Sequence, residues 1–326
     1  MESKSNNIFL GIDVGSVSTK MVVLDTETLE MIDHLYVRTH GDPLTSIRTV
    51  MKRLAEKQPQ AVVQASATTG SGRHLAARIM NTGIIKNEIT THTLAGVKIM
   101  PEVRTIVEIG GQDSKIIIIR DGMAIDFAMN TVCAAGTGSF LDQQAGRLEI
   151  KVEDMGEIAL SSENPSTISG RCTVFAETDM IHKQQIGIAT NDIVAGLCCS
   201  LVRNYLASVA KGKPIKPPVV FQGGVAANQG IVREFQEQTG FAFNVSPYYG
   251  VAGAYGAALL ASMAKDDQPE FRGFELLDKE LRIKSFACRK CEEACTVLML
   301  YRDGELISFW NDRCGRYSSG ELALKA

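Results

Sequence analysis

The chain has 326 residues, of which 45% are hydrophobic and 22% are charged, a balance typical of globular proteins. At about 150 residues per domain, this length predicts roughly two domains or one duplicated domain. The 34 Lys and Arg residues against 37 Asp and Glu residues give a net charge of −3. Such a balance lacks the basic excess that nucleic acid binding requires. We therefore expect no nucleic acid partner.

The N-terminus has no basic segment followed by a long apolar run, and no 18 apolar residues stand together. These features predict a cytoplasmic protein with no membrane segment. The eight cysteines are then the unusual feature of the composition. In a reducing compartment, thiols are more often buried side chains, metal ligands or redox groups than disulfides.

The first part of the chain predicts short strands that end in glycine turns, followed by a helix and a further strand. Apolar runs predict strands over 8–13 and 20–25, and these would form a hairpin. Apolar residues at 3/4 spacing predict an amphipathic helix over 43–56, and a buried strand follows over 60–67. This order is typical of an α/β fold.

The same layout begins again near residue 105. A strand over 105–110 enters a glycine turn, and a second strand returns over 114–119. A third glycine turn follows the apolar run 217–221, and helices are predicted over 228–239 and 250–264. The two hairpins resemble one another in layout rather than in residue identity, and they suggest an internal duplication.

Two of these turns carry the residues that phosphate groups need. The segment from Asp13 to Lys20 has the sequence DVGSVSTK, which joins a carboxylate, a glycine, three hydroxyls and a lysine. Glycine lets the backbone approach an anion, hydroxyl and N–H groups donate to phosphate oxygens, and a carboxylate can hold Mg²⁺ through water. It is not a Walker A loop. Alone, this turn fits an ordinary tight hairpin equally well.

The second turn, from Glu108 to Lys115, has the sequence EIGGQDSK and repeats these ingredients. Two such turns facing one another are what a nucleoside triphosphate requires, and Gly223 and Gly224 with Asn228 would supply a third wall. These three segments resemble the phosphate-1, phosphate-2 and adenosine motifs of the actin, hexokinase and heat-shock-chaperone ATPase superfamily. The resemblance spans residues 8 to about 264. It implies a duplicated RNase H-like fold with MgATP in a cleft between the halves, but this fold serves many functions.

Two cysteines narrow the function. Cys133 precedes a glycine pair and an apolar helical run, and Cys172 precedes another predicted helix. Helix N-termini favour thiolates, which are ligands of iron–sulfur clusters. Spacing alone favours packing roles, because two cysteines 39 positions apart (172 − 133) form no known ligand pattern. A 4Fe–4S cluster usually takes four thiolates, and a two-fold dimer would supply the missing pair.

The segments CAAGTGSFLD, GRCTVFAETDMI, GIDVGSVSTK and VEIGGQDSK closely resemble the activator ATPases of 2-hydroxyacyl-CoA dehydratases and their benzoyl-CoA reductase relatives. This resemblance implies a homodimer that shares one 4Fe–4S cluster, with Cys133 and Cys172 given by each subunit. It also implies that ATP hydrolysis drives low-potential, one-electron transfer to a partner iron–sulfur dehydratase or reductase. A ferredoxin or flavodoxin would supply the electron. We therefore expect the protein to be sensitive to oxygen and to work under anaerobic conditions.

The same resemblance implies the residues of the ATP site. Four candidates for Mg²⁺ contact and for orienting the attacking water are Asp13, Glu108, Gln112 and Asp113. A Gln that aligns water can serve as well as a base, because phosphoryl transfer asks chiefly for positioning. The residues implied to contact the nucleotide are Gly15, Ser16, Ser18, Thr19, Lys20, Gly110, Gly111, Gly223, Gly224 and Asn228.

The remaining cysteines divide into two groups. Cys198 and Cys199 lie in an apolar helical run over 193–206 and are predicted to pack, since adjacent helical residues point about 100° apart. The C-terminal segment carries four thiols in the pattern C-x₂-C-x₃-C plus one more, at Cys288, Cys291, Cys295 and Cys314. Four thiols suit zinc or a second iron–sulfur cluster. A β-hairpin over 296–309 would join the ligands.

The predicted domain limits follow from these motifs. Residues 1–103 and 104–249 would form the two RNase H-like halves, 250–270 a helix and linker, and 271–326 a cysteine-rich appendage. The chief alternative function is a small-molecule kinase of the same superfamily, which would have no use for Cys133 or Cys172. A chaperone-like ATPase is a third alternative, but 56 residues after the ATPase are too few for a substrate domain.

Overall fold

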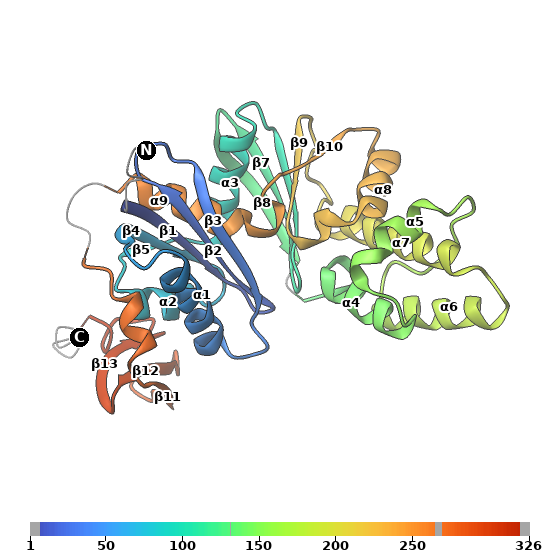
Figure 1. Ribbon diagram of the computed structural model, residues 1–326. Coiled ribbons are helices and arrows are strands. Elements are labelled where there is room, and N and C mark those ends of the chain that lie inside the picture. The colour runs from blue at the N-terminus through green and yellow to red at the C-terminus, as the bar shows by residue number, and fades with distance from the viewer. Residues whose placement is uncertain (1–6, 131, 265–268, 320–326) are drawn as a thin grey trace. The chain divides into compact units, whose positions relative to one another are not determined.

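Figure 1 shows the protein as a computed structural model that describes residues 7–130, 132–264 and 269–319. The chain divides into two compact units. Unit 1 comprises 1–87 and 257–326, and unit 2 comprises 88–256. The predicted halves, 1–103 and 104–249, have other limits and stay a prediction. Each unit has its own sheet with helices packed against it, so the predicted α/β class is confirmed.

The sheet of unit 1 has the strand order β3-β2-β1-β4-β5. The first three strands form an antiparallel meander, and the last two run parallel to β1. The strands are β1 (Asn7–Val14), β2 (Ser18–Asp25), β3 (Met31–Arg38), β4 (Val62–Thr69) and β5 (Ile84–Ile85). The predicted hairpin and the strand after the first helix are therefore confirmed.

Helices α1 (Pro43–Lys57) and α2 (Arg73–Met80) complete this part of unit 1. Asp42 caps α1, because its Oδ1 accepts a hydrogen bond from the Thr45 N–H at 3.0 Å. The buried face of α1 carries Ile47, Val50, Met51 and Leu54, which is the 3/4 pattern that predicts the helix. This face packs on the apolar side chains of β1 and β2.

The sheet of unit 2 repeats the order of unit 1, read as β8-β7-β6-β9-β10. Again three antiparallel strands are followed by two strands parallel to the first. The strands are β6 (Thr105–Ile109), β7 (Ser114–Arg120), β8 (Met123–Asn130), β9 (Val219–Gln222) and β10 (Phe243–Val245). This shared topology supports the internal duplication far better than the weak similarity of the two hairpins could.

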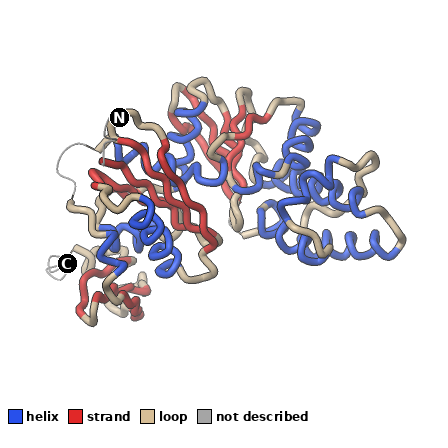
Figure 2. The backbone as a smooth tube through the Cα atoms, in the orientation of Figure 1, coloured by secondary structure: helices blue, strands red, loops and turns tan. Residues whose placement is uncertain are grey.

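Helices cover the sheet of unit 2 and continue beyond it (Figure 2). They are α3 (Glu88–Ile99), α4 (Gly138–Arg147), α5 (Met155–Leu160), α6 (Thr173–Gln185), α7 (Thr190–Ser208), α8 (Gln229–Thr239) and α9 (Ala252–Ser262), the last of which continues into unit 1. Short 3₁₀ turns are η1 (Ala134–Gly136), η2 (Val152–Asp154), η3 (Gly224–Ala227) and η4 (Tyr249–Val251). Helix α7 is buried along most of its length. The ring of its Tyr205 packs edge to face on that of Phe235 of α8, with ring centroids 5.3 Å apart.

The C-terminal residues form a 3₁₀ helix, η5 (Gly273–Leu277), and a three-stranded antiparallel sheet. Its strands are β11 (Leu281–Ala287), β12 (Thr296–Arg302) and β13 (Glu305–Trp310), so the predicted hairpin is present. Leu276, Leu300 and Trp310 join the same apolar cluster as α1 and α2. These residues therefore share the core of unit 1, although the sequence predicts a separate appendage.

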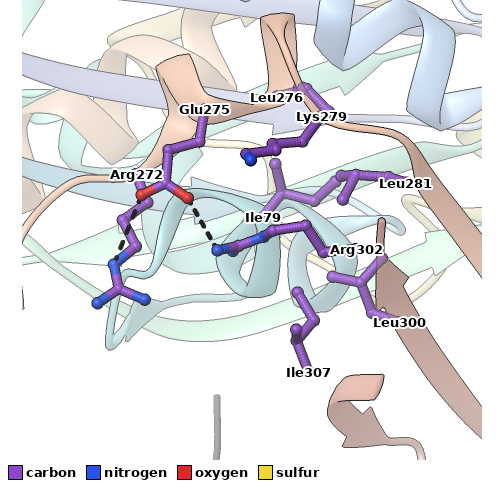
Figure 3. Close-up of a pocket in the computed structure, with 9 residues that line it drawn as sticks. All are labelled: Ile79, Arg272, Glu275, Leu276, Lys279, Leu281, Leu300, Arg302 and Ile307. Carbon is purple, nitrogen blue, oxygen red and sulfur yellow. Dashed lines mark hydrogen bonds and ion pairs between the residues drawn. The ribbon is translucent and has the colours of Figure 1, made fainter. Parts of the chain in front are cut away.

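Figure 3 shows how η5 connects this small sheet to α2. A shallow pocket lies where Ile79 of α2 faces η5 and β12. Glu275 of η5 pairs with Arg302 of β12 at 2.8 Å and with Arg272 at 3.8 Å. The pocket therefore lies at the contact of η5 and β12 with α2 within unit 1, where ion pairs cross it, and is not a nucleotide site. In the described ranges, no helix is long and apolar enough to cross a membrane.

Candidate nucleotide and cysteine sites

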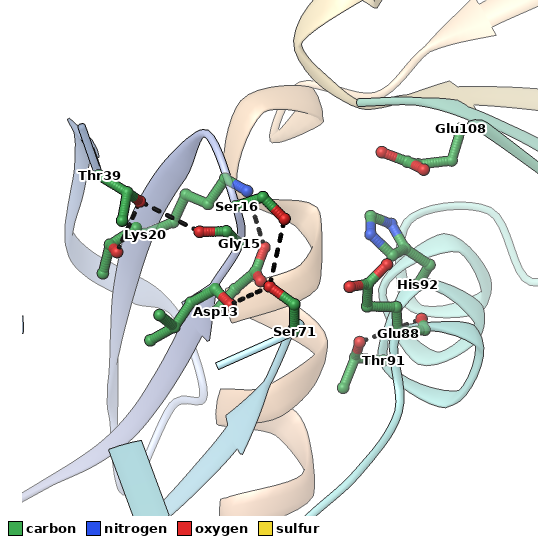
Figure 4. A network of polar contacts seen from close by, with 12 residues as sticks. Asp13, Gly15, Ser16, Lys20, Thr39, Ser71, Glu88, Thr91, His92 and Glu108 are labelled. Atoms are coloured by element: carbon green, nitrogen blue, oxygen red, sulfur yellow. Dashed lines mark hydrogen bonds and ion pairs between the residues drawn. The ribbon is translucent and has the colours of Figure 1, made fainter. Parts of the chain in front are cut away.

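The first phosphate turn, residues 13–20, joins β1 to β2 in unit 1. Strand pairing sets Asp13 opposite Lys20, and the Lys20 Nζ donates to Asp13 Oδ2 at 3.0 Å (Figure 4). Asp13 is buried, while Ser16 at the tip is exposed. The Gly15 N–H donates to the Ser18 carbonyl at 2.9 Å, which closes the turn. The turn thus places one buried carboxylate beside one ammonium group.

A neighbouring turn that sequence reasoning missed supports the first one. Gly70, Ser71 and Gly72 follow β4 and precede α2. A Cβ on Gly70 would lie 2.5 Å from Asp13 Oδ1, so only glycine lets the backbone pass so close to that carboxylate. The Ser71 hydroxyl lies 3.4 Å from the Ser16 hydroxyl. The run of Thr, Gly and Ser after the predicted strand 60–67 is the signal that could have revealed this segment.

The structure gives the Thr19 hydroxyl partners inside the protein. Thr19 is fully buried, and its Oγ1 lies 2.8 Å from the Ser46 hydroxyl and 3.2 Å from the Thr39 hydroxyl. Thr39 in turn donates to the Gly15 carbonyl at 3.1 Å. Thr19 therefore ties the first phosphate turn to the start of α1. Its predicted contact with the nucleotide stays a prediction.

The second phosphate turn, residues 108–115 of unit 2, surrounds a buried lysine. Lys115 is 1% exposed, and its Nζ lies 2.7 Å from Glu88, 2.9 Å from Glu108 and 2.8 Å from Asp113. Glu108 is the last residue but one of β6, Asp113 lies in the turn, and Glu88 begins α3. Gln112, by contrast, is exposed at the tip. The turn therefore brings three carboxylates to one ammonium group.

In this cluster, burial and the neighbouring charges shift the pKa values in opposite directions. Burial alone would lower the pKa of Lys115, but the charges of Glu108, Glu88 and Asp113 outweigh it and hold that pKa above its ordinary range. Burial also raises the pKa of Glu108, although the nearby Lys115 and His92 oppose this rise. Lys115 thus stays charged, and Glu108 is a carboxyl whose ionised form depends on its partner.

The turn after β9 approaches the second phosphate turn closely. Gly223 has a φ of +89°, and a Cβ there would lie 2.2 Å from the Ile109 carbonyl oxygen and 2.8 Å from Glu108 Oε1. Beside it, the Gln222 side chain lies 2.7 Å from Nδ1 of His92 on α3, which Figure 4 shows near Glu108. Sequence reasoning predicts Gly223 but misses His92 and Gln222, since they meet only in the fold.

Asn228 is one of the predicted nucleoside contacts, and that role stays a prediction. Its Oδ1 caps α8 by accepting from the Ile231 N–H at 3.0 Å. Its Nδ2 is buried and has no hydrogen-bond partner within the described ranges. A buried donor without a partner costs free energy, which a ligand acceptor would recover. Gly224, at the start of η3, is exposed.

Cys133 and Cys172 are both free and half-buried. Cys172 is the N-cap residue of α6, as predicted. Cys133 instead precedes the short turn η1, and α4 begins only at Gly138. Asn130 fixes this segment, because its Oδ1 accepts from the Cys133 N–H at 2.9 Å and its Nδ2 donates to the Cys133 carbonyl at 2.7 Å.

Residues 10–261 match the BadF/BadG/BcrA/BcrD ATPase family. The chain belongs to this family. The chain is similar to the (R)-2-hydroxyglutaryl-CoA dehydratase activating ATPase of Acidaminococcus fermentans, with 37% identity over 254 residues, 77% of this chain and 96% of the relative. The 2-hydroxyisocaproyl-CoA dehydratase activator of Clostridioides difficile is 33% identical over 276 residues, 81% and 98% of the two chains.

A solved structure agrees with this membership. The activator of the 2-hydroxyisocaproyl-CoA dehydratase from Clostridium difficile, with bound ADPNP, matches with a TM-score of 0.72 and 34% identity. The match covers 78% of this chain and 94% of that chain. Family membership and fold therefore support ATP binding and ATPase activity. The predicted actin-like ATPase fold is confirmed, whereas the cysteine-rich appendage lies beyond residue 261, where the family match ends.

The other cysteines of this ATPase family member differ in how deeply they are buried. Cys198 is fully buried in α7, as the packing prediction expects, and burial raises the pKa of its thiol to about 12. In the segments that flank the strands of the C-terminal sheet, Cys288 is buried, Cys295 is half-buried, and Cys291 and Cys314 are exposed. Across the described ranges, no three His, Cys, Asp or Glu side chains are grouped as a metal site. The predicted second metal site stays a prediction.

Proposed function

We propose that this chain is an ATP-driven electron donor that activates a partner iron–sulfur enzyme, such as a 2-hydroxyacyl-CoA dehydratase or a related reductase. In this proposal, two copies of the chain share a 4Fe–4S cluster, which supplies a one-electron donor. A ferredoxin or flavodoxin would reduce it in the cytoplasm, where free thiols persist. The observation that carries the proposal is that both cysteine-bearing segments contact one helix, α7, in the unit that holds the second phosphate turn.

The two cysteines fit a shared cluster. Each chain offers Cys133 and Cys172 as free thiols, and a 4Fe–4S cluster takes four thiolates, so two copies supply the full set. Large apolar side chains lie beside both: Val132 is 95% exposed, Val174 65% and Phe175 64%. Exposed apolar groups of this kind mark contact surfaces. A second copy of the chain would cover them while completing the ligand set.

The phosphate turns fit a magnesium nucleotide. Asp13, Glu108, Gln112 and Asp113 are the candidates to hold Mg²⁺ or its waters and to orient the attacking water. Carboxylate and amide oxygens are the ligands that Mg²⁺ prefers. Lys20 would neutralise phosphate oxygens in the first turn, and the free amide of Asn228 would donate to the nucleoside. These roles are parts of the proposal.

The four C-terminal thiols form a second part of the proposal. The Cys288 N–H donates to the Cys295 carbonyl at 2.8 Å, which sets these residues opposite one another at the base of a loop. The Arg313 N–H lies 3.5 Å from Cys295 Sγ, so the segment with Cys314 returns to the same loop. Four thiols in this loop would bind zinc or a second iron–sulfur cluster and hold Cys291 in place.

Anaerobic purification with measurement of iron, zinc and the visible spectrum tests both parts. We expect about four irons per dimer from the shared cubane cluster, together with a broad visible absorbance, and any zinc or additional iron would belong to the C-terminal thiols. Cys133→Ser and Cys172→Ser should each lose this iron, because each removes two of the four ligands of the dimer. A colourless, iron-free protein with full ATPase activity would refute the electron-donor proposal.

Matched controls separate ligand loss from general damage. Cys199→Ser alters a half-buried thiol on α7 and should leave the iron unchanged. Cys291→Ser should remove only a second metal. If Cys291→Ser removed all of the iron, the cluster would belong to the C-terminal cysteines instead. ATP hydrolysis of each variant, measured by phosphate release, shows whether the nucleotide site survives.

A further inference from the structure

Helix α7 contacts the second phosphate turn through one buried hydroxyl. Tyr205 is fully buried, and its hydroxyl donates to the Lys115 carbonyl at 2.8 Å. The ammonium group of the same Lys115 pairs with Glu108 and Asp113 of the turn. Tyr205 therefore joins α7 to the backbone of the residue that organises this turn. A buried hydrogen bond of this kind resists displacement, because breaking it leaves an unpaired carbonyl.

The preceding residue on α7 contacts both cysteine-bearing segments. The Asn204 Nδ2 donates to the Gly170 carbonyl at 2.5 Å, two residues before Cys172. On the other segment, Gly136 packs so closely that a Cβ there would lie 2.8 Å from Asn204 Oδ1. Gly136 follows Cys133 by three residues, and Asn204 is almost fully buried. One side chain thus contacts both cysteine-bearing segments.

A direct contact runs beside this one. The Gly138 N–H donates to the Gly110 carbonyl, and the Ser139 N–H donates to the Gly111 carbonyl, each at 2.8 Å. The Ser139 hydroxyl also donates to Gly111 at 2.5 Å. Gly110 and Gly111 belong to the second phosphate turn, and Gly138 begins α4, the helix after Cys133. The Cys133 segment therefore has two connections to the turn, one direct and one through α7, whereas the Cys172 segment is connected to it through Asn204 and Tyr205 of α7.

We propose that Asn204 and Tyr205 are positioning residues that couple the nucleotide state of the second phosphate turn to the arrangement of both cysteine-bearing segments. The inference rests on the proposed function, since it assigns these residues a role in ATP-driven activation. Adjacent helical residues point about 100° apart, so one rigid turn of α7 can contact the phosphate turn with one side chain and the cysteine segments with the other. A shift of the Lys115 backbone on nucleotide binding would move α7, and Asn204 would carry Gly136 and Gly170 with it.

Hydrogen–deuterium exchange on the full chain as purified tests this coupling. The exchange of peptides covering 108–115, 132–141 and 168–176 is compared without ligand and with saturating Mg²⁺ and ADPNP. In the unaltered protein, we expect the nucleotide to protect 108–115 and to change exchange in both cysteine peptides by about fivefold or more, the lower end of ordinary coupling between sites. Iron content, measured on the same samples, reports the cluster separately.

Two variants then remove the contacts of Tyr205 and of Asn204 separately. Tyr205→Phe deletes only the hydroxyl, and Asn204→Ala deletes both contacts with the cysteine segments. In each variant, the nucleotide should still protect 108–115 from exchange. Most of its effect on the exchange of 168–176 should be lost. The effect in 132–141 should be smaller in both variants but not absent, because the contacts of Gly138 and Ser139 remain. Thr178→Ala is the matched control, since its hydroxyl donates only within α6, to the Val174 carbonyl at 2.9 Å.

The outcomes separate the inference from the proposed function. The coupling role would be overturned if Tyr205→Phe and Asn204→Ala both showed the same nucleotide effects in the two cysteine peptides as the unaltered protein. It would also be overturned if, in the unaltered protein, the nucleotide protected 108–115 but changed the exchange of neither cysteine peptide. Because Tyr205→Phe keeps the ring packed on Phe235, it answers the question even if Asn204→Ala fails to fold. Absence of iron, with the coupling intact, would refute the electron-donor function alone. Failure of ADPNP to protect 108–115 would refute the ATP site and, with it, the inference.

Discussion

Replacing Lys115 with methionine should destabilise unit 2 strongly. The lysine is 1% exposed and contacts three carboxylates within 2.9 Å, one of which, Glu108, is itself buried. Methionine fills a similar volume but leaves these carboxylates without a counter-charge. Removal of one partner from a buried ion pair costs about 3–5 kcal/mol, and we expect the Lys115→Met variant to lose that much of its free energy of unfolding at neutral pH.

The loss should shrink at low pH. Burial raises the pKa of Glu108, and in the variant the opposing charge of Lys115 is gone. The folded variant therefore binds a proton more tightly than its unfolded chain does. That proton stabilises the fold below the ordinary carboxyl pKa, and the stability is lost as pH rises through the raised folded value. Between these values, the stability of the variant should fall by about 1.4 kcal/mol per pH unit for one proton.

Urea unfolding between pH 5 and pH 8 measures this effect, with two probes that separate the units. Far-UV circular dichroism follows both units, whereas the fluorescence of the single tryptophan, Trp310, follows unit 1. Only the circular dichroism transition should shift. The control is Lys213→Met, which breaks a surface pair with Asp126 at 2.7 Å in the same unit and should cost about 1 kcal/mol or less. Equal losses for the two variants, or a Lys115→Met loss independent of pH, would contradict the reasoning.

Three further expectations concern packing and reactivity. Gly223→Ala should cost at least about 2 kcal/mol, since its positive φ alone costs about 1 and its Cβ would clash with the Ile109 carbonyl; urea unfolding by circular dichroism checks this. Leu300→Ala should lower the stability of unit 1 by about 2–5 kcal/mol, and an unchanged Trp310 fluorescence transition would contradict this. In the folded chain at pH 8, iodoacetamide should modify Cys291 and spare Cys198, whose buried thiol has a pKa near 12; peptide mass spectrometry reads both.

The sequence predicts the local elements of the fold well, because their signals are local. The 3/4 spacing places a helix over 43–56, and the structure has α1 over Pro43–Lys57. Glycine turns after apolar runs identify the ends of β1, β6 and β9 correctly. The helix predicted over 228–239 corresponds to α8 (Gln229–Thr239). None of these features needs knowledge of distant residues.

The parts of the site that the sequence does not predict depend on contacts between residues that are far apart in the chain. Lys115 belongs to a predicted motif, yet it also pairs with Glu88, which lies 27 positions earlier (115 − 88) on a helix that sequence analysis does not predict. The pairing of His92 with Gln222 joins residues 130 positions apart. Thr19 looks like a phosphate donor in sequence, but the fold turns its hydroxyl toward Ser46. Side-chain direction and partner choice therefore remain tertiary properties.

The charge of the second phosphate turn predicts how strictly the nucleotide needs a metal. One lysine and three carboxylates sum to a formal charge of −2 (+1 − 3) when all four groups are ionised. A free triphosphate approaching this cluster meets net repulsion, whereas a divalent cation would be attracted to both and neutralise them. We therefore expect ATP binding, measured by calorimetry, to weaken at least about 100-fold when Mg²⁺ is replaced by a chelator, which corresponds to about 2.7 kcal/mol. Asp113→Asn removes one negative charge and should reduce that dependence, while Asp126→Asn, on the surface of the same unit, should leave it unchanged. Equally tight binding of ATP with and without Mg²⁺ would show that the carboxylates serve Lys115 alone.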